Sequence, residues 1–308
     1  MIRKRLQNRV AESRFAFPVA VVYATVVWMM AGLVGSSLYL QLGIFAVSTL
    51  MMVALNNTNA LIRIYSRMVS CSFIAMTCAA TFLFRNTEAV TVQMLFVLFY
   101  ISLLRSYQDK RAPGVVFYSF ACIGVASVFF VQILYFVPFF WLMMGANLMA
   151  LNNRMFWASI IGIIAPYWFI AGIYAWQDRI DELIAHFAAL AEFQPLGDYS
   201  MIDDNRLLTA CVIAVPVVIG TFHYLRNSYL DKIRTRMIFE MFITVNILAI
   251  AFIALQPQHF DMLLPIVIVN TSCLYAHFAA LTKTWITNIV FILMMLAMLA
   301  LTGYNLFM

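Results

Sequence analysis

The amino-acid sequence predicts an all-α polytopic membrane protein, a transmembrane bundle of about eleven spans with a cytoplasmic N-terminus and a periplasmic C-terminus. Three observations support this fold class. Of the 308 residues, 65% are hydrophobic and 10% are charged, whereas soluble domains carry about 25% charged residues. Apolar runs long enough to cross about 30 Å of hydrocarbon as a helix recur along the whole chain. These runs lack the alternation of apolar and polar residues that marks the strands of an outer-membrane barrel.

The apolar runs divide the chain into spans that are separated by polar turns. The basic segment 1–16 precedes seven spans within 17–176, a long polar loop follows at 177–206, and four spans fill 207–308. The two spans on either side of residue 130 meet with almost no turn between them. The spans are expected near 17–34, 38–55, 68–84, 90–106, 114–130, 131–149, 155–176, 207–225, 238–255, 263–281 and 285–305.

The positions of Lys and Arg predict the orientation of the bundle, because loops on the cytoplasmic side retain basic residues. With the N-terminus inside, the alternation of spans puts every Lys and Arg on the cytoplasmic side except Arg85, Arg179 and Arg206. The formal net charge of +6 suits contact with anionic lipid headgroups. No soluble domain remains to bind nucleic acid, so membrane lipids rather than nucleic acid are the expected partners.

The loop at 177–206 is predicted to form an amphipathic helix in its first half, because its apolar residues recur at helical spacing. Asp178 is the expected N-cap, and Pro195 with Gly197 is expected to end the helix. Such a helix would lie along the outer membrane surface with its apolar side towards the lipid chains.

Motifs of nucleotide, metal or hydrolytic chemistry are missing: the sequence contains no GxxxxGK[ST], HExxH, GxSxG or CxxC. We therefore expect no cofactor and no metal site. The cysteines fall inside predicted spans, where they are expected to pack as small side chains rather than to form disulfides; they are Cys71, Cys78, Cys122, Cys211 and Cys273.

Polar residues within the predicted spans are few, and almost none is a carboxylate. This argues against a transporter driven by protons or sodium ions, because such proteins keep acidic residues in the membrane. Asn246, Asn270 and His277 lie in spans nine and ten. Two interpretations of them stay open, which are hydrogen bonding between helices and a polar cavity that they line.

Prolines are expected inside spans six, seven and eight, at Pro138, Pro166 and Pro216. A proline removes a backbone donor and kinks a membrane helix. The three kinks either open a cavity at the outer leaflet or are ordinary bends of a packed bundle.

Ionisable side chains on the predicted periplasmic face are candidates for a lipid-phosphate site. Arg85, Arg179 and Arg206 would hold the phosphate, because guanidinium groups bind phosphate through paired hydrogen bonds. Glu182 and His186 are the candidate catalytic acid and base. The alternative is a solvated, mostly acidic loop without a site.

The sequence MVALNN at 52–57 returns as LMALNN at 148–153, and the LY pairs at 38–39 and 134–135 match at the same offset of 96. Asn readily adopts the left-handed conformation that caps the C-terminal ends of helices. We interpret both stretches as such caps at cytoplasmic helix ends, with a duplicated hairpin as the alternative.

The stretch SVFFVQILYFVPFFWLMMGANLMALNNRMFW, the following SIIGIIAPYWF and the earlier turn LNNTNALIR resemble a group of multi-spanning inner-membrane proteins of Bacteroidota. The resemblance lies mainly within 38–176. It implies a location in a bacterial inner membrane, and it implies no activity and no functional residue.

Two classes of function follow from these observations. The first is an enzyme or flippase-like protein that handles polyprenyl- or lipid-linked envelope glycans at the periplasmic face, with a polyprenyl-phosphate-linked substrate as partner. The second is a non-catalytic subunit or scaffold of an inner-membrane complex, with other membrane proteins as partners. A small-solute transporter that does not depend on embedded carboxylates ranks third.

Overall fold

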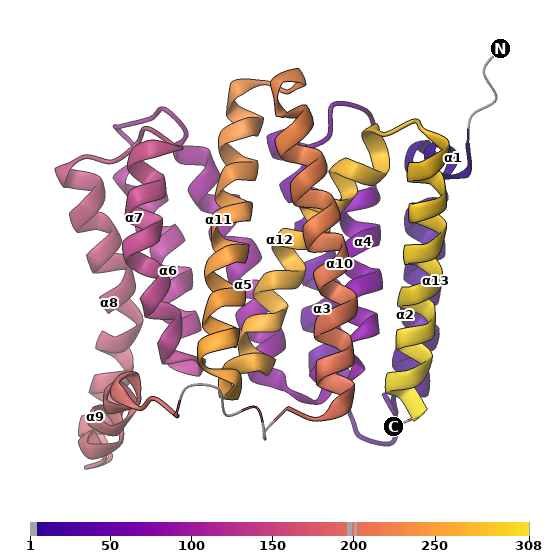
Figure 1. The fold of residues 1–308 in the computed structure, drawn as a ribbon. Coiled ribbons are helices and arrows are strands. Elements are labelled where there is room, and N and C mark those ends of the chain that lie inside the picture. The colour runs from indigo at the N-terminus through magenta and orange to yellow at the C-terminus, as the bar shows by residue number, and fades with distance from the viewer. Residues whose placement is uncertain (1–4, 196–198, 200–201, 308) are drawn as a thin grey trace.

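The computed structural model describes residues 5–195, 199 and 202–307, and every regular element in these ranges is a helix. Figure 1 shows the long helices side by side along one common direction, with the two chain ends at opposite ends of the bundle. We call these ends the α1 end and the α9 end. The α-helices are α1 (Leu6–Glu12), α2 (Ala16–Met30), α3 (Tyr39–Asn59), α4 (Met68–Ala79), α5 (Thr87–Leu103), α6 (Pro113–Phe129), α7 (Val137–Ala146), α8 (Asn153–Trp176), α9 (Ile180–Ala188), α10 (Asp204–Asn227), α11 (Ile233–Leu255), α12 (Phe260–Leu281) and α13 (Trp285–Phe307). Short 3₁₀ helices are η1 (Thr81–Arg85), η2 (Leu104–Ser106), η3 (Val131–Phe136), η4 (Ala189–Ala191), η5 (Ser228–Leu230) and η6 (Pro257–His259).

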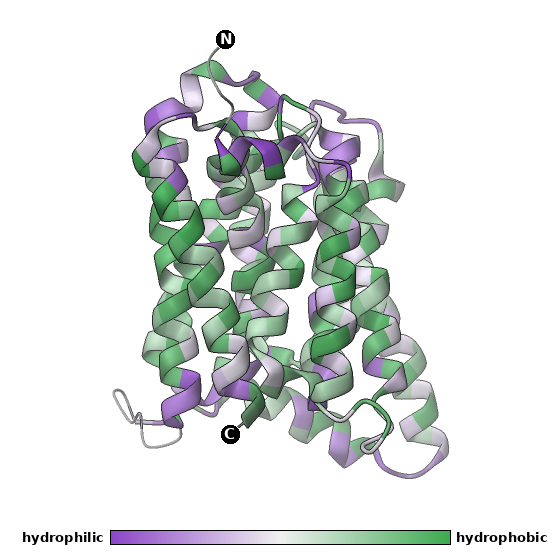
Figure 2. Cartoon of the chain, turned by 90° about the vertical axis from the view of Figure 1, so that its right-hand side faces the viewer, coloured by the Kyte–Doolittle hydropathy of each residue, from purple (hydrophilic) through white to green (hydrophobic). Residues whose placement is uncertain are grey.

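Seven helices of the described chain are long and apolar enough to cross a membrane. They are α3, α5 with η2, α8, α10 with η5, α11, α12 with η6, and α13. The pair α1 and α2, bent by 91°, would add an eighth. Figure 2 shows apolar residues along the length of the bundle and hydrophilic residues gathered towards its two ends. The all-helical fold with several membrane-length helices is therefore confirmed, and it indicates a membrane protein.

Two of the expected spans are broken helices. Span three is the short helix α4 followed by η1, and span six is η3 followed by α7. Pro138 consequently lies in the first turn of α7 and not inside a helix, where its fixed φ and missing N–H fit without a kink. The expected kink at Pro138 is therefore wrong, whereas Pro166 and Pro216 do lie inside α8 and α10.

Helix α12 is the centre of the bundle. Of its 22 residues, 19 are buried, and it packs against α4, α5, α10 and α11. Gly220 of α10 lies so close to it that an added Cβ would meet the Leu274 backbone at 2.9 Å. Small residues allow membrane helices this close approach.

A second close contact joins α6 and α8. A Cβ at Gly162 would lie 2.5 Å from the carbonyl oxygen of Phe117, and one at Gly124 would lie 2.6 Å from that of Ile163. Nearby, rings from α5, α6 and α7 form an aromatic cluster in which Phe99 and Phe140 have centroids 4.6 Å apart.

The two Asn-rich stretches have different roles. Asn56 and Asn57 lie in the last turns of α3, which ends at Ala60 in the left-handed conformation (φ 48°). In the second copy α7 has already ended, and Asn152 is the N-cap of α8, its side chain accepting a hydrogen bond from the Met155 N–H at 2.9 Å. The first pair does lie near a helix C-terminus, but neither pair is a left-handed cap, because Ala60 has that conformation in the first copy and Asn152 caps an N-terminus in the second.

The amphipathic helix expected in the long loop is α9, none of whose residues is buried. Figure 1 places it at the end of α8, at the lower edge of the bundle. Its N-cap is Arg179, and Asp178 has a left-handed backbone (φ 52°), so the assignment of Asp178 as N-cap is wrong by one residue. Gly197, expected to end the helix with Pro195, lies outside the described residues, as do Arg3 and Lys4 of the basic N-terminal segment.

Candidate functional site

The polar residues of spans nine and ten form hydrogen bonds in the core. The Tyr100 hydroxyl of α5 donates to Asn270 Oδ1 at 2.8 Å, and Asn246 Nδ2 of α11 donates to Thr271 Oγ1 at 3.1 Å. All four side chains are buried. The two asparagines therefore form hydrogen bonds between helices, which is the first of the two interpretations. Neither groove described below is lined by Asn246, Asn270 or His277.

His277 lies apart from the two asparagines, near the α1 end, and contacts a carboxylate that sequence reasoning missed. Its Nε2 is 2.9 Å from Asp231 Oδ2, and the two side chains are only 1% and 3% exposed. Asp231 follows η5 in the connection to α11, so the chain folds a loop residue back into the core. The Arg63 guanidinium lies 4.0 Å from the other Asp231 oxygen. The spans therefore enclose an ionisable pair although their own sequences hold almost no acid.

A second imidazole completes this buried cluster. The ring of His223 in α10 has its centroid 5.5 Å from that of His277. The Nδ1 atoms of both rings are buried and have no hydrogen-bond partner among the described residues. No sequence motif connects these residues, because they meet only when α10, α12 and the η5–α11 connection pack together.

At the α9 end, the predicted phosphate-binding arginines are divided between two places. Arg206 of α10 forms two 2.9 Å hydrogen bonds with Asp261 and also pairs with Asp203. Its guanidinium lies 5.4 Å from the ring centroid of Phe82 in η1, the helix that ends at Arg85. Arg85 is exposed, and no hydrogen bond or ion pair holds it within the described chain.

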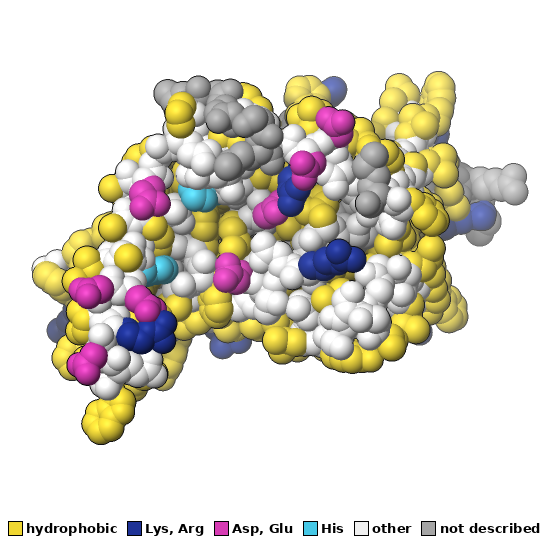
Figure 3. Space-filling view, turned by 90° about the horizontal axis from the view of Figure 1, so that it is seen from below, with side chains coloured by type: hydrophobic (Ala, Val, Ile, Leu, Met, Phe, Trp, Pro, Cys, Tyr) yellow, Lys and Arg dark blue, Asp and Glu magenta, His cyan; other side chains and the backbone are white. Residues whose placement is uncertain are grey.

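Arg179 belongs to the other place, at the start of α9. It forms hydrogen bonds of 2.5 and 2.7 Å with Glu182, and both side chains are about half exposed. The Glu182 carboxylate raises the pKa of Arg179 through these hydrogen bonds. Figure 3, which looks onto the α9 end, shows acidic and basic side chains in separate small groups with hydrophobic atoms between them. The structure thus brings Arg179 and Glu182 together and does not join them to Arg206.

His186, the other predicted catalytic residue, attaches α9 to the bundle. Its Nε2 lies 3.0 Å from the Ser127 carbonyl oxygen and 3.3 Å from the Tyr167 hydroxyl. A neutral imidazole that donates from Nε2 to this carbonyl keeps Nδ1 as its proton acceptor. The contacts with Ser127 of α6 and Tyr167 of α8 thus fix the position of the His186 ring.

An aromatic groove of about 590 Å³ lies beside the segment that follows α9. Its walls come from η3, α7 and α11, with Phe193 and Gln194 at its edge; it is lined by Tyr135, Phe136, Phe139, Phe193, Gln194, Leu248, Ala251, Phe252, Leu255 and Gln256. The Tyr135 hydroxyl donates to the Leu190 carbonyl, and Gln194 and Gln256 exchange hydrogen bonds of 3.0 and 3.1 Å. The segment after α9 is thereby fixed along the groove.

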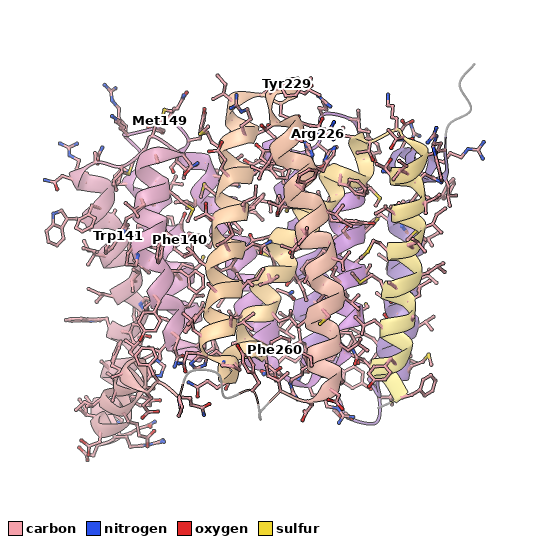
Figure 4. The ribbon with its side chains drawn as sticks, in the orientation of Figure 1. Phe140, Trp141, Met149, Arg226, Tyr229 and Phe260 are labelled. Carbon is pink, nitrogen blue, oxygen red and sulfur yellow. The ribbon has the colours of Figure 1, made fainter. Side chains whose placement is uncertain are left out.

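Different side chains lie at the two ends of the bundle and between them. Figure 4 shows Met149, Arg226 and Tyr229 at the α1 end and Phe260 at the α9 end, with Phe140 and Trp141 between them on α7.

Within the described ranges no group of three or more His, Cys, Asp or Glu side chains is placed to hold a metal ion. Comparisons with family models, with curated proteins and with solved structures find no match to this chain.

Proposed function

We propose that the chain crosses a bacterial inner membrane eleven times, with its α1 end in the cytoplasm and its α9 end in the periplasm. The broken helices α4–η1 and η3–α7 and the shorter α2 and α6 would cross together with the seven long helices. The distribution of basic residues supports this orientation, since the connections at the α1 end carry most of them, and Arg85, Arg179 and Arg206 belong to η1, the start of α9 and the start of α10.

We further propose that the protein handles a lipid-linked phosphate substrate of the polyprenyl type at its α9 end, as a transferase, polymerase or flippase. The observation that carries this proposal is the aromatic groove. Rings such as Phe136, Phe139 and Phe252 offer broad apolar contact to an unsaturated hydrocarbon chain. An open groove in the wall of the bundle admits such a chain from the membrane.

The polar residues of the site would act where this groove meets the water. His186 lies one helical turn before Ala189, whose carbonyl accepts a hydrogen bond from Gln132 beside the groove at 3.3 Å. In this proposal His186 acts as the base close to the emerging headgroup. Arg85 pairs with no carboxylate among the described residues and is a phosphate candidate at the α9 end, although the helices against which η1 mainly packs, α3, α4, α5 and α13, are not walls of this groove.

Substitution of the groove aromatics tests the proposal. We expect Phe252→Ala and Phe139→Ala each to lower polyprenyl-phosphate binding about tenfold, because each removes buried apolar contact worth about 1.5 kcal/mol. Native mass spectrometry of the protein in nanodiscs containing polyprenyl phosphate in phosphatidylethanolamine measures the bound fraction.

Phe222→Ala is the matched control, because Phe222 is a 66% exposed ring on α10 and is not among the residues that line this groove. Equal binding by the groove variants and this control would contradict the proposal. That result would favour the subunit alternative, for which α8 offers Trp157, Trp168 and Trp176 as exposed contact residues.

A further inference from the structure

A second groove opens at the other end of the bundle, between α2, α4, α12 and α13, with a volume of about 540 Å³. We call it the methionine groove, because Met68 and Met76 of α4 face Met294 and Met298 of α13 across it. Methionine side chains are flexible and polarizable, and they adapt to irregular apolar ligands. The wall is therefore suited to a hydrocarbon chain.

Two hydroxyl groups in this wall have no partner. Tyr275 and Ser72 are 7% and 5% exposed, both line the groove, and their oxygens form no hydrogen bond among the described residues. Buried polar groups are nearly always paired, and an unpaired one costs about 1–3 kcal/mol. A ligand with only hydrocarbon would leave both hydroxyls unpaired. Protein atoms cover both oxygens, so a rotation of each side chain would pair it with a ligand that places acceptor oxygens among its apolar atoms.

The depth of the hydroxyls limits which acceptor fits. Tyr275 lies six residues before the end of α12 at Leu281, which is roughly 9 Å along a helix, and Ser72 lies four residues after the start of α4 at Met68, roughly 6 Å. Both helix ends are at the α1 end. The acceptors are thus needed several ångströms below the membrane surface, where the ester carbonyls of glycerophospholipids lie beneath the phosphate.

Two exposed arginines flank, in the sequence, the residues of α1 and the α1–α2 connection that line the groove. Val10, Ser13 and Phe15 line it, and the exposed Arg9 and Arg14 are next to them in the chain. No hydrogen bond or ion pair engages either guanidinium within the described residues. Glu12, the acid of the same helix, already interacts within the protein.

Helix α1 is fixed in place beside the groove. The Gln7 side chain donates to the Ala279 carbonyl at 2.8 Å and to Thr282 Oγ1 at 2.5 Å, and the Asn8 side chain donates to the Thr282 carbonyl at 2.9 Å. These bonds tie α1 across the end of α12, at 91° to α2. The two arginines are therefore presented at the membrane surface and not on a free terminus.

We propose that the methionine groove binds one anionic glycerophospholipid. Its phosphate lies at Arg9 and Arg14, its ester carbonyls accept hydrogen bonds from Tyr275 and Ser72, and one acyl chain lies along the methionines. The site is separate from the aromatic groove, so the proposal does not depend on the function proposed for the α9 end.

Native mass spectrometry tests this assignment with the full-length protein taken from nanodiscs that contain phosphatidylglycerol in phosphatidylcholine. We expect one retained phosphatidylglycerol, and about three- to tenfold less with Tyr275→Phe or with Arg14→Gln, the loss that one hydrogen bond or charge contact produces. Ala75→Phe, which fills the groove, should abolish retention.

The controls are Tyr118→Phe and Arg154→Gln, an exposed tyrosine on α6 and an exposed arginine on α8 that do not line the groove. Both should retain the lipid as the unmodified protein does. Equal retention of phosphatidylcholine and phosphatidylglycerol would overturn the charge assignment. Unchanged retention in Tyr275→Phe and Ala75→Phe, with both variants monodisperse, would overturn the site.

Discussion

The buried pair of Asp231 and His277 allows a prediction of how much one carboxylate contributes to the stability of the fold. Removing one partner of a buried pair leaves the other without compensation, which costs about 3–5 kcal/mol. We therefore expect Asp231→Ala to lower the free energy of unfolding in detergent by about 3 kcal/mol, measured by chemical denaturation.

The control for this substitution is Asp109→Ala, at an exposed residue of a connection at the same end. It should leave stability close to that of the unmodified protein. A His277→Phe variant that is destabilised as much as Asp231→Ala, with no further loss in the double variant, would show that the two residues act as one unit. Equal stability of Asp231→Ala and Asp109→Ala would refute a stabilising role for the Asp231–His277 pair.

At the scale of elements, the contact of α6 with α8 leaves no room for a side chain at Gly162. We expect Gly162→Leu to separate the two helices and to destabilise the protein by about 1–3 kcal/mol. Gly172→Leu is the matched control, because it changes the same helix at a position with no atom within 4 Å of an added Cβ. Thermal unfolding in detergent compares the two, and equal midpoints would contradict the close packing.

Elements also show where sequence reasoning succeeds. Long apolar runs located the helices, because both the lipid-facing and the buried side of a membrane helix are apolar. For the same reason the runs did not distinguish α12, of whose 22 residues 19 are buried, from α13, of whose 23 residues five are buried. The apolar runs also did not reveal that the Asp231 side chain is buried. An aspartate in a loop looks the same in the sequence whether its side chain faces water or the core.

At the scale of the whole molecule, the proposed eleven-span topology predicts which connections face each side of the membrane. In a variant whose five free cysteines are replaced by serine, we expect Gln108→Cys to react with an impermeant maleimide only after the cells are permeabilised. Asp178→Cys should react in intact cells, because it precedes α9. Labelling of both positions from the same side would exclude the topology.

The candidate site at the α9 end was predicted only in part, because the sequence does not show which ionisable residues are already paired. From the sequence, Arg206 is a candidate phosphate ligand. In the structure its Nε lies 2.9 Å from Oδ1 of Asp261, a residue far along the chain. The aromatic groove was equally hidden, since its walls come from α7 and α11 and its edge from the segment after α9. Such sites depend on contacts between distant segments, which residue patterns alone do not specify.

The central position of α12 has a consequence for biosynthesis. This helix follows α4, α5, α10 and α11 in the chain, yet it is the surface on which all four pack. During translation the packing faces of those four helices, including Tyr100 and Asn246, therefore lack their α12 partners until α12 is made. The core of the bundle can form only after α12 has been synthesised, so the stable packing of these four helices comes late in synthesis.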